Sequence, residues 1–121
     1  MTKTIEQYSL EQMMSLIEKA LNEKNEAIQD VNSVYQFDIK DEDVVIYQLQ
    51  LSNGVAKVTK GSELEAVCTL KMSLGSFRKF LIGKLNGTTA FMMGKLKIDG
   101  DLGKAMKIES ILRQYDIEEY L

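Results

Sequence analysis

The chain contains no histidine, no proline and no tryptophan, and its one cysteine is Cys68. Because histidine is the commonest general base and metal ligand near neutral pH, its absence argues against most catalytic triads and metal centres. A lone cysteine forms no intramolecular disulfide, CxxC pair or thiolate zinc cage. Its neighbours Ala66, Val67 and Leu70 are apolar, so we interpret Cys68 as a buried structural thiol in a reducing, intracellular setting.

Targeting and membrane-spanning patterns are also missing. The first residues lack the apolar centre of a signal peptide, and no stretch approaches the roughly 20 apolar residues of a membrane span. The last residues, DIEEYL, do not match a peroxisomal signal. These absences predict a cytoplasmic protein.

The composition is that of one ordinary globular domain. The chain has 121 residues, of which 45% are hydrophobic and 27% charged. Its net charge of -3 argues against nucleic acid as the main partner. Beyond residue 67, however, basic side chains outnumber acidic ones. We interpret this half as solvated surface, with contact to an anionic membrane or a ligand carboxylate as the sharper alternative.

Apolar periodicity divides the chain into a helix followed by strands. Ser9 and Gln12 form a capping-box pattern, and the apolar residues after them predict an amphipathic helix over 9–24. The period then changes to two, which predicts four strands within 34–72, arranged as a meander with one apolar face and the fourth strand over 66–72.

The dipeptide Asn53-Gly54 predicts a two-residue type I′ hairpin turn. Such a turn opposes Leu51 to Ala56 and Leu49 to Val58 on the face that the helices cover. The same register turns a second set of side chains toward solvent: Gln48, Gln50 and Lys57.

Helical spacing returns after residue 72. Caps and closing glycines delimit two short helices, over 73–82 with Ser73 and Gly83 and over 86–93 with Asn86 and Gly94. Alternation at Leu96 and Ile98 predicts a fifth strand that ends at Gly100, and Asp101 is expected to cap a last helix. The two short helices carry more apolar residues than one buried face requires. Ordinary packing is the simpler interpretation, and a ligand pocket is the alternative.

Residues able to perform chemistry are scarce. The stretch between Gly87 and Gly94 does not have the spacing of a phosphate-binding loop. The carboxylates at Asp41, Glu42 and Asp43 fall in a predicted turn and do not match a calcium-binding loop. We therefore expect a protein that is not an enzyme, with no cofactor and no metal.

Residues 67–112 carry a long motif, with CTLKMSLGSFRKFLIGKLNG followed by GKLNGTTAFMMGKLKIDGDLGKAMKIESIL. This motif resembles the sterol carrier protein type two family of lipid-binding domains. The resemblance implies an α+β fold with a five-stranded, mostly antiparallel sheet, helices packed on one face and an apolar tunnel between the layers. Many family members have proline where this chain has Gly87, which predicts a looser helix start that keeps the Asn86 cap.

The resemblance implies a protein that binds a fatty acid, acyl-CoA, sterol or other lipid without catalysis and transfers it within the cell. The expected tunnel residues are Tyr47, Leu49, Met72, Phe77, Phe80, Leu81, Phe91 and Met92. Three basic residues are expected near the tunnel mouth, for a membrane or a ligand headgroup: Arg78, Lys79 and Lys84. We expect a monomer that contacts anionic membranes transiently. The alternatives are a dimerisation module whose apolar surface a second subunit covers, and a hydrolase or thioesterase.

Overall fold

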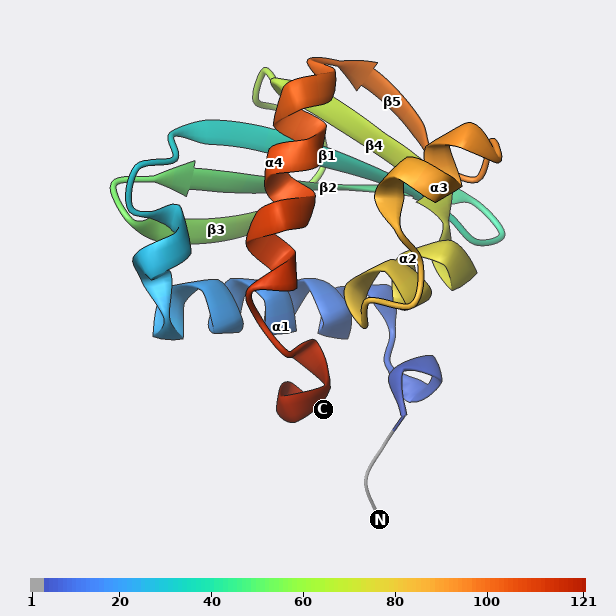
Figure 1. Ribbon diagram of the computed structural model, residues 1–121, viewed down its shortest axis with the longest axis horizontal. Coiled ribbons are helices and arrows are strands. Elements are labelled where there is room, and N and C mark those ends of the chain that lie inside the picture. Colours follow the sequence, from blue (N-terminus) through green and yellow to red (C-terminus); the bar gives the residue numbers. More distant parts are fainter. Residues whose placement is uncertain (1–3) are drawn as a thin grey trace.

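The computed structural model describes residues 4–121 as one five-stranded sheet with helices on one face (Figure 1). The strands are β1 (Ser33–Lys40), β2 (Val44–Ser52), β3 (Val55–Lys60), β4 (Cys68–Ser73) and β5 (Lys97–Gly100). Their order across the sheet is β3-β2-β1-β4-β5, and every neighbouring pair is antiparallel except β1 with β4. The predicted α+β class and mostly antiparallel five-stranded sheet are confirmed.

The predicted meander is wrong at its fourth strand. β4 does not pair with β3. It lies beside β1, in parallel, with Tyr35 opposite Cys68 and Phe37 opposite Leu70. The connection over 61–67 carries the chain back past β2 to the other side of β1. Apolar alternation identified the buried face of β4 correctly but contains no information about which strand lies next to it.

The β2–β3 hairpin has the predicted register. Asn53 and Gly54 both have positive φ, 53° and 76°, as a type I′ turn requires. Leu49 pairs with Val58 and Leu51 with Ala56. Leu49, Leu51 and Ala56 are buried, which confirms that this side of the hairpin belongs to the core.

Gln48 does not point to solvent as predicted. Its side chain is buried because the connection after β3 folds back over this side of the sheet. Gln48 Nε2 donates to the carbonyl oxygen of Leu64 at 2.7 Å and to Gln36 Oε1 at 2.9 Å, while Gln48 Oε1 accepts from the Leu64 amide at 3.1 Å. The polar side chain of Gln48 therefore anchors the connection after β3 to the sheet.

Helix α1 (Leu10–Glu23) covers the outer edge of β3. Asn22 bonds Ala56 twice, donating to its carbonyl oxygen and accepting from its amide, both at 2.8 Å. Glu18 Oε2 accepts from the Val58 amide at 2.6 Å. Side chains of the helix thus take the place of a neighbouring strand. The Ser9 capping box forms as predicted.

The remaining helices are α2 (Leu74–Leu81), α3 (Gly87–Met92) and α4 (Leu102–Arg113), with short 3₁₀ turns η1 (Ile5–Gln7), η2 (Asn25–Ile28) and η3 (Ile117–Tyr120). Ser73, Asn86 and Asp101 cap α2, α3 and α4 with their side chains, as predicted. Gly83 and Gly94 have φ of 78° and 76°, which confirms their role at the helix ends. Among the described residues, no helix has both the length and the apolar character needed to span a membrane.

The core lies between the sheet and the helical layer. Figure 1 shows α4 crossing the middle of the sheet, with α1 along one end of this layer and α2 and α3 beside α4. The largest buried side chains come from all parts of this arrangement and include Tyr35, Phe37, Phe77, Phe80, Met13 and Ile17. Phe37 and Phe77 meet edge to face, with ring centroids 5.9 Å apart.

The buried amide of Gln48 leads to a stability prediction. The substitution Gln48→Leu leaves both backbone groups of Leu64 without their partner, so the free energy of unfolding should fall by about 1–3 kcal/mol. Urea denaturation followed by circular dichroism measures this change. The matched control is Gln50→Leu on the same strand, which should change stability by less than about 0.5 kcal/mol. Equal effects of the two substitutions would contradict the role of Gln48.

Candidate functional site

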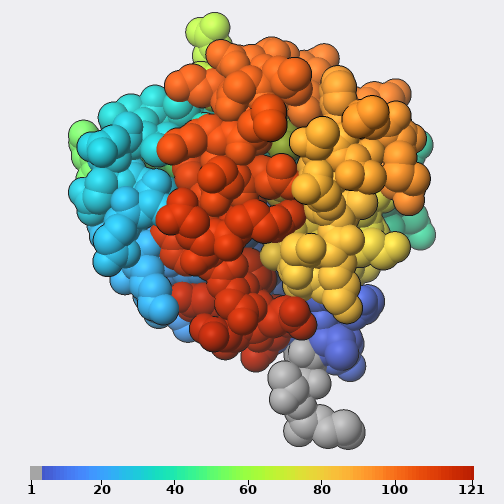
Figure 2. Space-filling model, in the orientation of Figure 1, coloured from blue at the N-terminus to red at the C-terminus, as the bar shows by residue number. Residues whose placement is uncertain are grey.

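An apolar cavity lies between the β4–β5 side of the sheet and helices α3 and α4, and its volume is about 110 Å³. In Figure 2, which looks onto this face, α3 and α4 flank a recess. The floor and walls are mostly apolar. The lining residues are Leu70, Phe80, Gly87, Thr88, Phe91, Leu96, Ile98, Leu102, Ala105, Met106 and Glu109.

The burial of these residues separates the interior of the cavity from its mouth. Leu70, Phe80 and Ala105 are buried, and they supply the interior. Phe91 and Met106 are 45% and 56% exposed, so they form the rim. An apolar cavity with an apolar, partly exposed rim suits a ligand that is itself mostly apolar.

Two of the predicted tunnel residues, Phe80 and Phe91, line this cavity. Met92 points outward and is 81% exposed. Tyr47 is buried and lines a separate pocket that α1 borders. The other predicted residues lie in the core: Leu49, Met72, Phe77 and Leu81.

Sequence reasoning expected Met72 from β4, whereas Leu70 is the β4 residue that lines the cavity, and it missed the contributions of β5 and α4. Leu70 and Ile98 are paired across β4 and β5 and both line it. On α4, Leu102, Ala105, Met106 and Glu109 follow the i, i+3, i+4, i+7 spacing of one helix face. That spacing was present in the sequence, but the parallel placement of β4, which brings α4 over this part of the sheet, was not evident from it.

Helix α3 is less buried than ordinary packing predicts. Only Gly87 and Ala90 are buried within it, while Phe91, Met92 and Met93 at its end are all exposed. The packing interpretation of this apolar segment is therefore wrong for its last three apolar residues. α3 covers the cavity, while the apolar side chains at its own end remain exposed.

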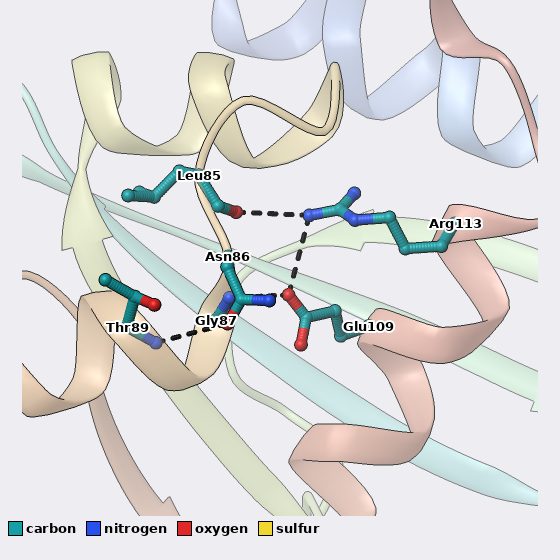
Figure 3. Close-up of polar contacts among 6 residues, drawn as sticks. All are labelled: Leu85, Asn86, Gly87, Thr89, Glu109 and Arg113. Carbon is teal, nitrogen blue, oxygen red and sulfur yellow. Dashed lines mark hydrogen bonds and ion pairs between the residues drawn. The ribbon is translucent and has the colours of Figure 1, made fainter.

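Polar contacts hold the start of α3 against α4 (Figure 3). The Gly87 amide donates to Glu109 Oε2 at 2.6 Å, and the Thr89 amide donates to Asn86 Oδ1 at 3.2 Å. Arg113 Nη2 donates to the Leu85 carbonyl oxygen at 3.2 Å and lies 3.5 Å from Glu109 Oε2. The Arg113 guanidinium also stacks over the Phe80 ring, 5.0 Å from its centroid.

Glycine at position 87 permits the Glu109 contact. A Cβ atom at residue 87 would lie 2.7 Å from Glu109 Oε1, and proline would have no amide hydrogen to donate. The predicted Asn86 cap is confirmed. The predicted loosening of the helix start stays a prediction, and the Gly87 amide has a charged acceptor there in Glu109.

The predicted basic residues lie apart from this cavity. Arg78 Nη2 donates to the Tyr8 carbonyl oxygen at 2.9 Å, so the guanidinium contacts the N-terminal segment. Lys84 lines another pocket together with Glu6 and Glu118, near the chain ends. Lys79 is exposed on α2. None of the three is among the residues that line the cavity.

Cys68 is buried, as predicted. Burial, with a smaller contribution from the charge of Asp101, raises the pKa of its thiol to about 11. A thiol with this pKa is protonated near neutral pH and is a poor nucleophile. Within residues 4–121, no group of histidine, cysteine or carboxylate side chains is arranged to hold a metal ion.

The fold defines a class of small α+β domains in which helices cover one face of a mixed five-stranded sheet. The chain belongs to the SCP-2 sterol transfer family, whose sequence profile matches residues 11–113. The resemblance noted in the sequence is thereby confirmed.

Individual relatives agree with this assignment. Hydroxysteroid dehydrogenase-like protein 2 of Xenopus laevis is 40% identical over 106 residues, which are 87% of this chain and 25% of that protein. Sterol carrier protein 2 of Homo sapiens is 33% identical over 102 residues, 81% of this chain and 19% of that protein. The solution structure of sterol carrier protein domain 2 of Helicoverpa armigera superposes with a TM-score of 0.76 at 27% identity, covering 94% of this chain and 93% of that one. The chain thus spans about a quarter or less of the curated relatives, which are longer proteins.

The raised pKa of Cys68 predicts slow alkylation of the folded protein. At pH 8 the native thiol should react with iodoacetamide at least about a hundredfold more slowly than in urea, because a pKa of about 11 leaves it protonated and burial blocks access. Mass spectrometry of timed samples measures both rates. Equal rates in the native and the unfolded protein would show that Cys68 is not a buried thiol with a raised pKa.

The Glu109 contact predicts a local effect on α3. The substitution Glu109→Ala removes the acceptor of the Gly87 amide and should lower the free energy of unfolding by about 1–3 kcal/mol. The Gly87 amide should also exchange its hydrogen faster, as measured by NMR. The control is Ser110→Ala, the exposed neighbour on α4. Unchanged protection of the Gly87 amide in the Glu109→Ala variant would refute the assigned role.

Proposed function

We propose that this domain binds a single long apolar ligand, such as a fatty acid, an acyl-CoA or a sterol, and passes it on chemically unchanged. The observation that carries the proposal is the apolar cavity under α3, with its exposed apolar rim. Membership in the SCP-2 sterol transfer family supports it. The direct ligand contacts in this proposal are Phe80, Phe91, Leu70, Ala105 and Met106.

The size of the cavity indicates how a ligand would enter. Its volume of about 110 Å³ is well below the roughly 300 Å³ at the lower end of small-molecule sites, so a long ligand requires an outward movement of α3. Gly83 and Gly94, both with positive φ, bracket the segment that would move. Few buried side chains oppose this movement, because α3 buries only Gly87 and Ala90.

Burial of the ligand supplies the driving force. Each methylene group removed from water contributes about 0.8 kcal/mol, so ten of them contribute roughly 8 kcal/mol before the costs of binding. Breaking the Glu109–Gly87 contact would cost about 1.5–3 kcal/mol of this. For ligands with long acyl chains, the free energy of burial exceeds this cost and favours the open, loaded state. For ligands with short acyl chains, the closed, empty state is favoured.

A substitution that fills the cavity tests the proposal. Ala105 is buried at the cavity wall, and Ala105→Leu places additional methyl groups in the space. We expect the affinity of delipidated protein for a fluorescent fatty acid to fall by at least about tenfold, or roughly 1.4 kcal/mol. Fluorescence titration measures the affinity, and a thermal melt establishes that the variant is folded.

The control is Ser110→Leu, which adds the same side chain to the exposed face of α4 and should bind the fatty acid as the parent protein does. A folded Ala105→Leu variant with unchanged affinity would place the ligand outside this cavity. Absence of saturable binding in the delipidated parent protein would refute the proposed function itself.

A further inference from the structure

The methionines within residues 4–121 divide into two groups by burial. Three of them are almost completely buried in the core: Met13, Met14 and Met72. The others are exposed by 81%, 62% and 56%: Met92, Met93 and Met106. Only the second group is readily reached by a small solute such as a peroxide.

The exposed methionines lie on the two helices that flank the apolar cavity. Met92 is the last residue of α3, and Met93 follows it as the C-cap. Met106 lies on α4 and is one of the residues that line the cavity, whereas Met92 and Met93 are not. Figure 2 shows the recess between these helices. Met106 is thus exposed to solvent and part of the cavity lining at the same time.

A methionine sulfur reacts with hydrogen peroxide without a neighbouring catalytic group. A sulfur lone pair attacks one peroxide oxygen, the O–O bond breaks, and the other oxygen leaves as water after proton transfer. The sulfur is oxidised by two electrons to a sulfoxide, and the peroxide is reduced. Methionine sulfoxide reductases return the sulfoxide to the thioether with electrons from thiols, so the modification is reversible.

Cys68 competes poorly for this oxidant. The thiolate is the reactive form of cysteine. Burial raises the pKa of the Cys68 thiol to about 11 and also separates it from solvent. Near neutral pH, oxidation is therefore directed to the exposed methionines.

We propose that Met106 is a reversible oxidation site through which hydrogen peroxide weakens the binding of an apolar ligand. The inference rests on the proposed function, because it takes the cavity as the ligand site. A thioether is an apolar, adaptable lining group, whereas a sulfoxide is strongly polar. A ligand that covers the oxidised side chain would remove water from the S=O group, and this desolvation opposes binding.

The cavity offers little to replace that water. Thr88 supplies the one side-chain hydroxyl among the described lining residues. Glu109 lies three residues after Met106 on the same helix face, and its carboxylate already accepts from the Gly87 amide at 2.6 Å. A carboxylate donates no hydrogen bond to a sulfoxide oxygen, and the two electron-rich groups repel each other.

Peroxide treatment of the delipidated protein tests the proposal. Near neutral pH, peptide mass spectrometry should find Met92, Met93 and Met106 oxidised at least about fivefold faster than the three buried methionines. The affinity for a fluorescent fatty acid should fall by at least about fivefold as Met106 becomes oxidised. Methionine sulfoxide reductases with a dithiol should restore it. A thermal melt establishes that the oxidised protein is folded.

Two variants assign the effect to one sulfur. Met106→Leu keeps an apolar side chain and has no sulfur to oxidise at this position, so its affinity should be the same before and after peroxide treatment. The matched control combines Met92→Leu and Met93→Leu. It removes the two more exposed sulfurs and should still lose affinity on oxidation, as the parent protein does. Each variant is compared with itself, so its starting affinity does not affect the result.

The outcomes separate this inference from the proposed function. A parent protein that binds the fatty acid equally well with Met106 reduced and oxidised would overturn the inference alone. So would an equal loss of affinity in Met106→Leu and the parent protein, or oxidation of Met106 no faster than that of the buried methionines. Absence of saturable binding before oxidation would instead refute the proposed function, and with it the effect of Met106 on binding.

Discussion

The parallel pairing of β1 with β4 is the contact on which the rest of the domain depends. β1 lies at the centre of the sheet, and its buried residues Tyr35 and Phe37 stand beside Cys68 and Leu70 of β4. β3 and β4 run in the same direction, so the chain returns across the back of the sheet over 61–67, where Gln48 fastens it. The same pairing carries β5, α3 and α4 to the far side of β1, where the apolar cavity forms between them.

Local features of the fold were predictable because their causes are local. The Asn53-Gly54 turn and the caps at Ser9, Ser73, Asn86 and Asp101 follow from the conformations and hydrogen bonds of a few adjacent residues. The neighbour of β4 and the burial of Gln48 were not predictable in this way, since both depend on contacts between distant segments. For the same reason the sequence pointed to Phe80 and Phe91 in the cavity but not to Leu70 or Ala105, which reach it from other elements.

Helix α3 combines firm attachment at one end with little burial along its length. Asn86 and Glu109 hold its first amides, whereas its last residues face outward and only Ala90 and Gly87 reach the interior. Local stability in proteins follows buried contacts, so α3 is a segment expected to open before the sheet does. Under the proposed function, such a covering element would yield to a ligand large enough to replace its few contacts.

The side chains that α1 places along β3 affect how the domain behaves among other proteins. An exposed strand edge is a template on which another chain can form hydrogen bonds, and it is a common origin of aggregation. On β3 the outward groups of Ala56 and Val58 are already occupied by Asn22 and Glu18. These contacts suppress aggregation through the β3 backbone. They do so in a domain that also exposes apolar side chains beside its cavity.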